Sequence, residues 1–185
     1  MDIKPKLICI VGETASGKDT VVNETIRRFY DYRIRQVCSY ADRPMRNNET
    51  NGVEHYFITT DEFNELKENR KDDILAYTHI IDENNPNSHG YQYMALTDEV
   101  NKSQIYIIDY IGLKNLKELH GDNISIVSVY ITAPYETRMN RAKERSDFNT
   151  SFKKRVENEQ AQFDEFSESR EYDYKIINDE NRPSK

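Results

Sequence analysis

The sequence predicts an α/β protein in which helices flank a parallel β-sheet. Short β-rich runs alternate with amphipathic stretches, as in parallel strands joined by crossover helices. A glycine-containing loop directly follows the first apolar run and directly precedes a helical pattern. Of the 185 residues 36% are hydrophobic, and 13 Tyr and 7 Phe supply large side chains for a core. Intrinsic disorder is therefore not expected.

Four apolar runs are predicted to be the core strands. They lack strict alternation, as expected for strands that helices cover on both faces. A helix is expected from Gly17 to about Tyr30, because apolar residues recur there at helical spacing. The predicted core strands are Leu7–Val11, Ile105–Asp109, Ile124–Ile131 and Tyr174–Asn178.

Residues 36–95 are predicted to be a small β-rich insertion in a core made of residues 1–35 and 96–185. One helix is expected in it at about Asp61–Asn69, because Thr59 and Glu62 can form a capping box. Residues 82–90 are a loop by composition. The predicted strands of the insertion are Gln36–Tyr40, Glu54–Ile58 and Ile74–Ile80.

Two helices are expected after the third core strand. Tyr135–Arg145 carries arginines at spacings of three and four residues, which places three guanidinium groups on one helix face. Phe152–Phe166 is a long polar helix with one buried stripe. The arginines are Arg138, Arg141 and Arg145, and the stripe is Phe152, Val156, Phe163 and Phe166.

The net charge of −7 argues against a general nucleic-acid or membrane-surface binder, since such proteins rely on a basic field. The first apolar run is far short of the roughly 20 residues that a membrane span needs, and no export signal is expected. Cys9 and Cys38 lie in strand-like runs and are predicted to be reduced core residues. We expect a cytoplasmic monomer or homodimer.

The sharpest signal is Gly12–Thr20, with the sequence GETASGKDT, between a strand and a helix. This is a phosphate-binding P-loop in its required context. Its glycines let backbone N–H groups surround a phosphate, and Lys18 reaches toward the outer phosphates. A P-loop NTPase-type sheet that binds a nucleoside triphosphate is therefore predicted. The ATP-binding candidates are Gly12, Glu13, Thr14, Ala15, Ser16, Gly17, Lys18, Asp19 and Thr20.

Asp19 stands where a Ser or Thr usually follows the lysine and ligates Mg²⁺. A carboxylate is a hard oxygen ligand, so Asp19 is the candidate ligand of an Mg²⁺ cofactor. The alternative is that Asp19 only favours the start of a helix through the helix dipole.

A second cluster begins with Ser39-Tyr40-Ala41-Asp42-Arg43-Pro44-Met45-Arg46 and continues with Glu49, Gly52 and Phe57. It resembles the acceptor-binding segment of the guanylate kinase family, S-x-T-T-R-x-P-R-x-G-E-x-x-G-x-x-Y-x-F. The proline is one place early, and His55 stands where the family has a phosphate-binding tyrosine. The resemblance covers nearly the whole chain: Asp109–Gly112 is similar to the family's D-x-x-G, and Tyr172–Asp179 to its closing Y-D-Y…N-D strand. The residues in register are Ser39, Arg43, Arg46, Glu49, Gly52 and Phe57.

The resemblance implies a P-loop nucleoside-monophosphate kinase that converts ATP and GMP to ADP and GDP with Mg²⁺. It also implies a helical lid at about residues 136–150, which contains Arg138, Arg141 and Arg145. Two arginines three residues apart suit a phosphate, although by themselves they would more often be a solvated face. Glu49 is expected to orient Arg46. The implied catalytic residues are Lys18, Arg141, Arg145 and Arg155, and the implied acceptor-binding residues are Ser39, Arg43, Arg46, Glu49, Tyr91, Tyr93 and Asp109.

The positions that would read the base depart from the family. Ala76 stands at its glutamate. Either Tyr93-Met94-Ala95, with Ala95 at the position of the family's Ser or Thr, or His89-Gly90-Tyr91 stands in for the second base-reading motif. If the acceptor is GMP, another acceptor group such as Thr78, Asp82 or Glu83 must replace the glutamate, because buried donors left unpaired cost roughly 1–3 kcal/mol each.

Two alternatives remain. Ribose 1,5-bisphosphate kinases also resemble the chain, in the Asp after the P-loop lysine and in lacking the guanine glutamate, but they are not expected to keep both acceptor arginines and Glu49. A non-catalytic guanylate-kinase-like interaction module typically degrades the P-loop, whereas Gly12, Gly17 and Lys18 are present here. Small-molecule nucleotides are the expected partners, and nucleic acid and membranes are not.

Overall fold

The computed structural model describes residues 4–46, 49–81, 89–144 and 152–179. The chain forms two compact units. The first, called here the mixed-sheet unit, comprises Met1–Leu7, Arg35–Gln104 and Ile111–Ser125. The second, called the P-loop unit, comprises Ile8–Ile34, Ile105–Tyr110 and Ile126–Lys185. The assignment of residues 36–95 to acceptor binding stays a prediction.

The P-loop unit is built on a four-stranded sheet with the strand order β6-β1-β7-β8. Strand β1 pairs in parallel with β6, and β7 pairs in parallel with β8. These are the four core strands that the sequence predicts. Their bounds are Lys6–Val11 for β1, Ile105–Ile107 for β6, Ser125–Thr132 for β7 and Tyr174–Ile177 for β8.

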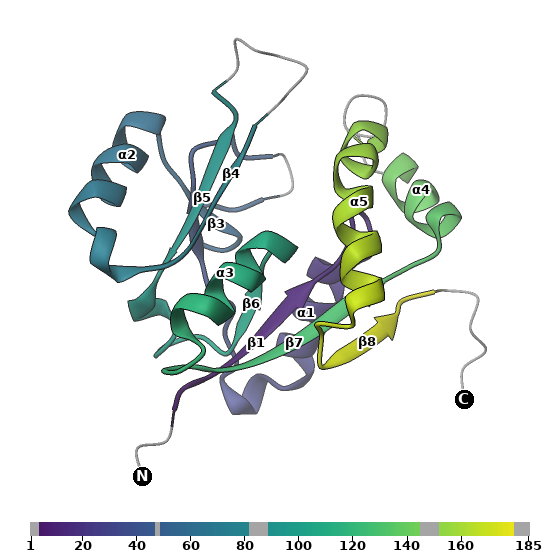
Figure 1. The fold of residues 1–185 in the computed structure, drawn as a ribbon, viewed down its shortest axis with the longest axis horizontal. Coiled ribbons are helices and arrows are strands. Elements are labelled where there is room, and N and C mark those ends of the chain that lie inside the picture. Colours follow the sequence, from purple (N-terminus) through teal and green to yellow (C-terminus); the bar gives the residue numbers. More distant parts are fainter. Residues whose placement is uncertain (1–3, 47–48, 82–88, 145–151, 180–185) are drawn as a thin grey trace. The chain divides into compact units, whose positions relative to one another are not determined.

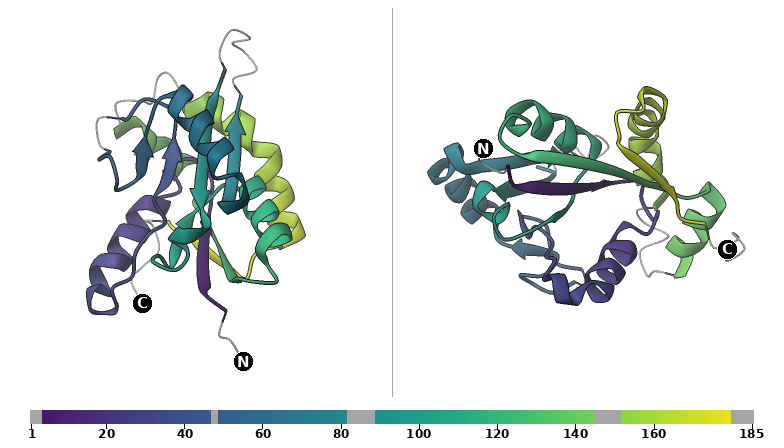
Figure 2. Two further views of the ribbon diagram at one scale, coloured as in Figure 1. Left: turned by 90° about the vertical axis from the view of Figure 1, so that its left-hand side faces the viewer. Right: turned by 90° about the horizontal axis from the view of Figure 1, so that it is seen from below.

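Helices α1 (Lys18–Arg28) and α5 (Lys153–Ser169) lie on opposite faces of this sheet (Figure 2). Helix α4 (Tyr135–Glu144) follows β7, and a short 3-10 turn, η1 (Tyr30–Tyr32), follows α1. The predicted stripe of α5 is confirmed, because all four of its side chains are buried. One core cluster joins α1 to the sheet through Ile10, Val22, Ile105 and Ile131.

Strand β8 differs from the expectation that helices cover every core strand on both faces. Its four residues are all exposed, including Ile176 and Ile177. In the strand order β8 is the last strand and has only β7 beside it. A terminal strand is screened less by flanking helices, so the apolar pattern of Tyr174–Ile177 overstates its burial.

The mixed-sheet unit contains a second four-stranded sheet with the order β3-β2-β5-β4 (Figure 1). Strands β2 and β3 are parallel, and β5 is antiparallel to both β2 and β4. Strand β5 was not predicted from the sequence. The bounds are Ser39–Ala41 for β2, His55–Phe57 for β3, Ile74–Ile80 for β4 and Tyr91–Leu96 for β5.

Helix α2 (Thr60–Asn69) packs on this sheet through Phe63, which contacts the buried Met94 and Leu96. The predicted capping box at its start is confirmed, with Thr59 as the N-cap and Glu62 as its reciprocal partner. Helix α3 (Tyr110–His120) was not predicted. Two 3-10 turns complete the described elements, η2 (Lys71–Asp73) and η3 (Thr97–Glu99).

Both cysteines are free and buried, as predicted. Burial, with the nearby carboxylates of Glu99 and Glu54, raises the pKa of Cys38 to about 11. Its thiol is therefore unreactive at neutral pH. Within the described ranges, no helix has both the length and the apolar character to cross a membrane.

Candidate functional site

The loop that leaves β1 passes against the neighbouring strand β7. A Cβ atom on Gly12 would lie 2.0 Å from the carbonyl oxygen of Ile131, so only glycine fits at this point. Gly17 is the N-cap of α1 and has a φ of 90°, which is the left-handed region that glycine adopts without strain. The two glycines of the predicted P-loop are thus required by its backbone path.

Lys18 folds back over this loop at the start of α1. Its Nζ donates to the carbonyl oxygens of Gly12 at 2.7 Å and Glu13 at 3.1 Å. The ammonium group therefore lies beside the loop backbone, where it can meet a bound phosphate.

Two arginines of α4 point at the same loop. Arg138 Nη1 donates to the carbonyl oxygen of Thr14 at 3.4 Å, and Arg141 Nη1 donates to that of Ser16 at 3.2 Å. Asn178, at the end of β8, donates its side-chain amide to Ser16 at 2.9 Å and accepts from Arg141 Nη2 at 3.1 Å. The structure thus brings Lys18, Arg138 and Arg141 to one loop.

The other two arginines predicted for this site have different outcomes. Arg145, one of the predicted lid residues, lies outside the described residues. Arg155 is half-buried on α5. Its predicted role on the transferring phosphoryl group stays a prediction.

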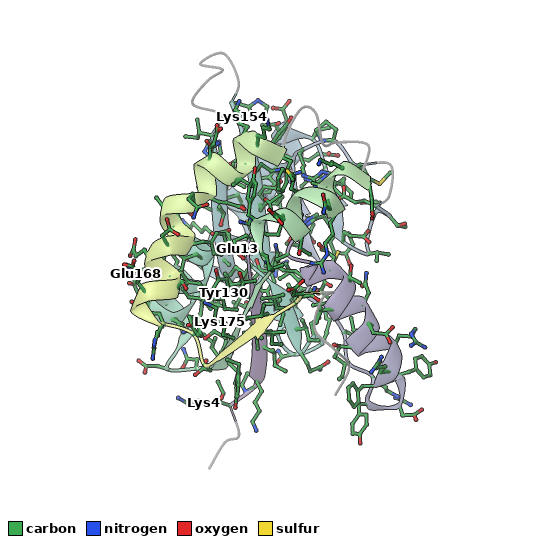
Figure 3. All side chains as sticks on the ribbon, turned by 90° about the vertical axis from the view of Figure 1, so that its right-hand side faces the viewer. Lys4, Glu13, Tyr130, Lys154, Glu168 and Lys175 are labelled. Carbon is green, nitrogen blue, oxygen red and sulfur yellow. The ribbon has the colours of Figure 1, made fainter. Side chains whose placement is uncertain are left out.

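The loop is also fixed from within the unit by Glu13, which contacts Tyr130 and Thr132. Figure 3 labels Glu13 and Tyr130. Glu13 Oε1 accepts from the hydroxyl groups of Tyr130 at 2.8 Å and Thr132 at 3.0 Å. Burial raises the pKa of Tyr130, and the carboxylate of Glu13 raises it further. Lys175 Nζ lies 4.9 Å from the centroid of the Tyr130 ring. Glu13 therefore acts as a structural anchor of the loop.

Sequence reasoning missed the contact between Glu159 and Thr14. The Glu159 carboxylate accepts from the backbone N–H of Thr14 at 2.7 Å and from its hydroxyl at 2.9 Å. Arg138 Nη1 lies 3.6 Å from the same carboxylate. Glu159 is one of several acidic residues of a polar helix, so its sequence gave no signal that would single it out.

Asp19 lies exposed in the first turn of α1, directly after Lys18. Proteins usually hold Mg²⁺ with one or two carboxylates, and substrate phosphates and water complete the shell. One exposed carboxylate next to a phosphate loop fits that arrangement. Among the residues that the structure describes, no group of three or more His, Cys, Asp or Glu side chains could hold a metal ion by itself.

In the mixed-sheet unit, Arg43 is buried in a polar cluster. Its Nη1 and Nη2 atoms donate to the two oxygens of Glu49 at 2.7 and 2.6 Å, and its Nε donates to the hydroxyl of Tyr93 at 3.1 Å. The guanidinium carbon also lies 5.1 Å from the centroid of the Phe57 ring. Burial alone would lower the pKa of Arg43, but the contacts with Glu49 and Tyr93 outweigh it and raise that pKa.

The expected contact of Glu49 with Arg46 is present as an ion pair, but Arg46 is not the closest partner of Glu49. The bidentate partner of Glu49 is Arg43, and the guanidinium group of Arg46 is 3.7 Å away. The backbone N–H of Arg46 also donates to Glu49 at 2.8 Å, so the carboxylate holds the backbone of this turn as well. That side chain is 49% exposed, against 6% for Arg43.

The remaining acceptor candidates of this unit lie on β2 and β5. Ser39 Oγ is 2.8 Å from His55 Nδ1, and the ring of His55 is 5.6 Å from that of Tyr93. Tyr93, which contacts Arg43, is therefore in this cluster. Tyr91 is 43% exposed and its ring lies near His89 instead.

The two positions of the missing base readers are direct neighbours. Ala76 on β4 pairs with Ala95 on β5, and both are buried. Asp109 belongs to the P-loop unit, where it follows β6 and is half-buried. Of the suggested replacements, Thr78 is half-buried on β4, and Asp82 and Glu83 lie outside the described residues.

Comparison with known proteins gives one consistent family. Residues 4–182 match the family model described as guanylate kinase. The chain is similar to a guanylate kinase of Campylobacter jejuni subsp. jejuni, with 29% identity over 100% of this chain and 85% of that protein. A guanylate kinase of Photobacterium profundum is 25% identical over 96% of this chain and 81% of its own length. The crystal structure of guanylate kinase from Anaplasma phagocytophilum has a TM-score of 0.63 and 25% identity, covering 96% of this chain and 79% of that one.

Proposed function

The chain belongs to the guanylate kinase family, and we propose from this premise that it transfers the γ-phosphoryl group of ATP to GMP, giving ADP and GDP. The family prediction, the α/β fold class and the class of nucleoside-monophosphate kinase are confirmed by the family match and by the similarity in fold.

The observation that carries the proposal is the convergence of three cationic side chains on one glycine loop. Lys18, Arg138 and Arg141 all donate to its backbone carbonyl oxygens. A nucleoside triphosphate brings several negative charges, which these groups can neutralise. Lys18 would contact the outer phosphates, and Arg141 with Arg155 the transferring group. Arg145 is proposed for the same role from the sequence alone.

The acceptor needs no general base. The second pKa of a phosphate monoester is about 6, so the attacking oxygen is already ionised near pH 7. The enzyme must therefore position two phosphates and neutralise their charge. Mg²⁺ would be held through Asp19 and would neutralise part of the donor's charge.

On the acceptor side, Arg46 is the best candidate for direct contact with the phosphate, because its guanidinium group is half-exposed. Arg43 and Glu49 would support the phosphate-binding position of Arg46 as a buried ion pair. Ser39, Tyr91 and Tyr93 complete the proposed acceptor set in this unit, and Asp109 belongs to the proposed set in the other.

Guanine as the base is supported by the relatives, which are named guanylate kinases. Ala76 and Ala95 offer no polar side chain for it, so Thr78 is the proposed acceptor of a guanine donor. We also propose a role in purine nucleotide metabolism in the cytoplasm, where the two free thiols remain reduced.

A coupled assay of ADP release tests this proposal. The acceptors would be GMP, dGMP, AMP, CMP, UMP and ribose 1,5-bisphosphate, each with MgATP. The expected result is the highest kcat/KM with GMP. A preference for ribose 1,5-bisphosphate would overturn the choice of acceptor. ADP release that no acceptor stimulates, from a protein with native circular dichroism, would overturn the kinase activity and favour an interaction module.

A further inference from the structure

The carboxylate of Glu159 binds to the loop that, in the proposed function, binds the nucleotide phosphates. Its Oε1 accepts from the backbone N–H of Thr14 at 2.7 Å, and its Oε2 accepts from the Thr14 hydroxyl at 2.9 Å. Both oxygens are thus committed to one residue of the loop. Helix α5 supplies this carboxylate, and α5 and the loop after β1 lie side by side in Figure 1.

The surroundings of this carboxylate are those that bind phosphate. Arg138 Nη1 is 3.6 Å from Oε1. The backbone N–H of Thr14, and then the positive charges of Lys18 and Arg138, act to lower the pKa of Glu159. An ionised Glu159 is therefore attracted by the same donors and cations that a nucleotide needs.

These attractions do not hold the ionised carboxylate firmly. Burial raises the pKa of Glu159 by more than the contacts with Thr14, Lys18 and Arg138 lower it. Burial therefore weakens the hold of the loop on the charged carboxylate, so a more highly charged ligand can displace it. The side chain of Glu159 is 20% exposed, so part of it already meets solvent.

Glu159 and a nucleotide phosphate are mutually exclusive ligands of Thr14. The single N–H proton of Thr14 is directed at Oε1 at 2.7 Å. A phosphate oxygen at the same N–H would meet the carboxylate at a distance where like charges repel strongly. The triphosphate carries the greater charge and is therefore the stronger ligand of the loop.

We propose that Glu159 is an internal ligand of the P-loop that the nucleotide phosphates must displace, and that it thereby sets the affinity of the chain for ATP. The inference rests on the proposed function, because it needs the loop to be a nucleotide site. It assigns Glu159 a positioning role and no part in the chemical step.

Four variants separate the possible effects of this residue. Glu159→Asp keeps the charge but shortens the side chain by one methylene, so the contact with Thr14 is lost. Glu159→Gln keeps the reach but removes the charge. Glu159→Ala removes both. Glu157→Gln removes one negative charge from an exposed position of the same helix and is the matched control.

Isothermal titration calorimetry on the full chain would measure the dissociation constants of ATP and of inorganic tripolyphosphate. Glu159→Ala and Glu159→Asp should bind both about tenfold more tightly than the wild type, as expected for one charge-assisted hydrogen bond of roughly 1.5 kcal/mol. Glu159→Gln should fall between them and the wild type, and Glu157→Gln should match the wild type. In the assay, KM for ATP should fall in the same order without a rise in kcat.

Three results would overturn the inference. Glu159→Asp could bind ATP with wild-type affinity while only Glu159→Gln and Glu159→Ala bind it more tightly. That result would show that the negative charge of residue 159 repels the phosphates from a distance and does not compete for Thr14. Weaker binding in Glu159→Ala would show that Glu159 supports the phosphate site. Equal binding by all variants would remove Glu159 from the site but leave the proposed function standing. If neither the wild type nor any variant binds ATP or tripolyphosphate, the proposed nucleotide site itself fails.

Discussion

Arginines in the two units are held in different ways. In the P-loop unit, Arg138 and Arg141 donate to backbone carbonyl oxygens at 3.4 and 3.2 Å, and the carboxylate of Glu159 is 3.6 Å from Arg138. In the mixed-sheet unit, Arg43 donates to both oxygens of a carboxylate at 2.7 and 2.6 Å. A bidentate pair with a charged acceptor is roughly twice as strong as a bond to a neutral one. Arg43 is thus part of the fold of its unit, whereas the arginines of α4 can exchange carbonyl oxygens for phosphate oxygens.

The largest expected effect comes from breaking the buried pair. Glu49→Gln would leave Arg43 buried with an uncompensated charge, since the two side chains are only 9% and 6% exposed. Such a loss costs about 3–5 kcal/mol. Urea unfolding should show a decrease in unfolding free energy of that size. Glu65→Gln, on the exposed face of α2, should stay within about 0.5 kcal/mol of the wild type. Equal stability of the two variants would show that the pair is not structural.

The stability that the Arg43–Glu49 pair contributes should also depend on pH. Burial would raise the pKa of Glu49, but hydrogen bonds from Arg43 and Arg46 outweigh it and lower this pKa from its ordinary 4.5. The stabilisation is therefore present above pH 4.5 and is lost as the pH falls through the lowered value. Wild-type protein should lose stability in this acid range, and Glu49→Gln should lose less over the same range. Parallel acid-unfolding curves would contradict this.

The next variant tests the P-loop unit, the other side of the comparison. Lys18→Ala removes the cation that folds over the P-loop and should lower turnover at least about a hundredfold, since one such group is worth roughly 3 kcal/mol in the transition state. The fold should remain, because Lys18 is only half-buried and its hydrogen bonds to Gly12 and Glu13 go to neutral carbonyl oxygens. Lys153→Ala, exposed at the start of α5, is the control and should keep full turnover. Unchanged turnover in Lys18→Ala would remove the loop from the active site.

Local signals explain which parts of this comparison could be predicted. The capping box of Thr59 and Glu62 and the glycine loop before Lys18 are short motifs whose partners lie within a few residues. The stripe of α5 repeats at helical spacing, so its burial follows from the sequence. These features depend on local geometry alone.

Strand β5 was not predicted from the sequence because its buried face carries a glutamine. Gln92 is 7% exposed, and its side-chain amide donates to Asp42 at 3.1 Å and to Asn64 at 3.2 Å. Its carbonyl oxygen accepts from Tyr77 at 2.8 Å. A polar residue among hydrophobic neighbours breaks the alternation on which strand prediction depends. Only the fold brings its three partners together.

The full set of partners of the charged groups could not be predicted from the sequence either. The sequence analysis expects Glu49 to orient Arg46, and that ion pair is present, but the bidentate partner of Glu49 is the buried Arg43, six residues away. Glu159 and Thr14 are separated by 145 positions, and nothing in either segment indicates the contact. Which ion pair forms is decided by burial and by long-range packing, and a single sequence records neither.

A third prediction sharpens the contrast within the mixed-sheet unit. Arg46→Ala should leave stability within about 0.5 kcal/mol of the wild type, because the contact of Arg46 with Glu49 through its backbone N–H survives the substitution. The KM for GMP should rise about tenfold or more, since a hydrogen bond to a charged group is worth roughly 1.5–3 kcal/mol. Lys71→Ala is the exposed control in the same unit. If Arg46→Ala unfolds like Glu49→Gln, both arginines are structural and the contrast fails.

The smallest expected effect concerns the carboxylate of the P-loop unit that faces solvent. Asp19 lies in the first turn of α1, where it is exposed and can either ligate Mg²⁺ or only stabilise the helix start. Asp19→Ala would remove both roles, and Asp19→Asn would remove the charge but keep an oxygen ligand. If the carboxylate is a ligand, the Mg²⁺ concentration for half-maximal turnover should rise several-fold in Asp19→Ala and less in Asp19→Asn, while saturating Mg²⁺ restores most of the turnover. If Asp19 only favours the helix start, both variants should lose about 0.3–1 kcal/mol of stability with an unaltered Mg²⁺ titration.

Titrating Mg²⁺ at constant free ATP, beside a urea unfolding curve for each variant, separates the two roles. An unaltered Mg²⁺ titration would mean that the carboxylate serves the helix and that phosphates and water supply the metal's ligands without it.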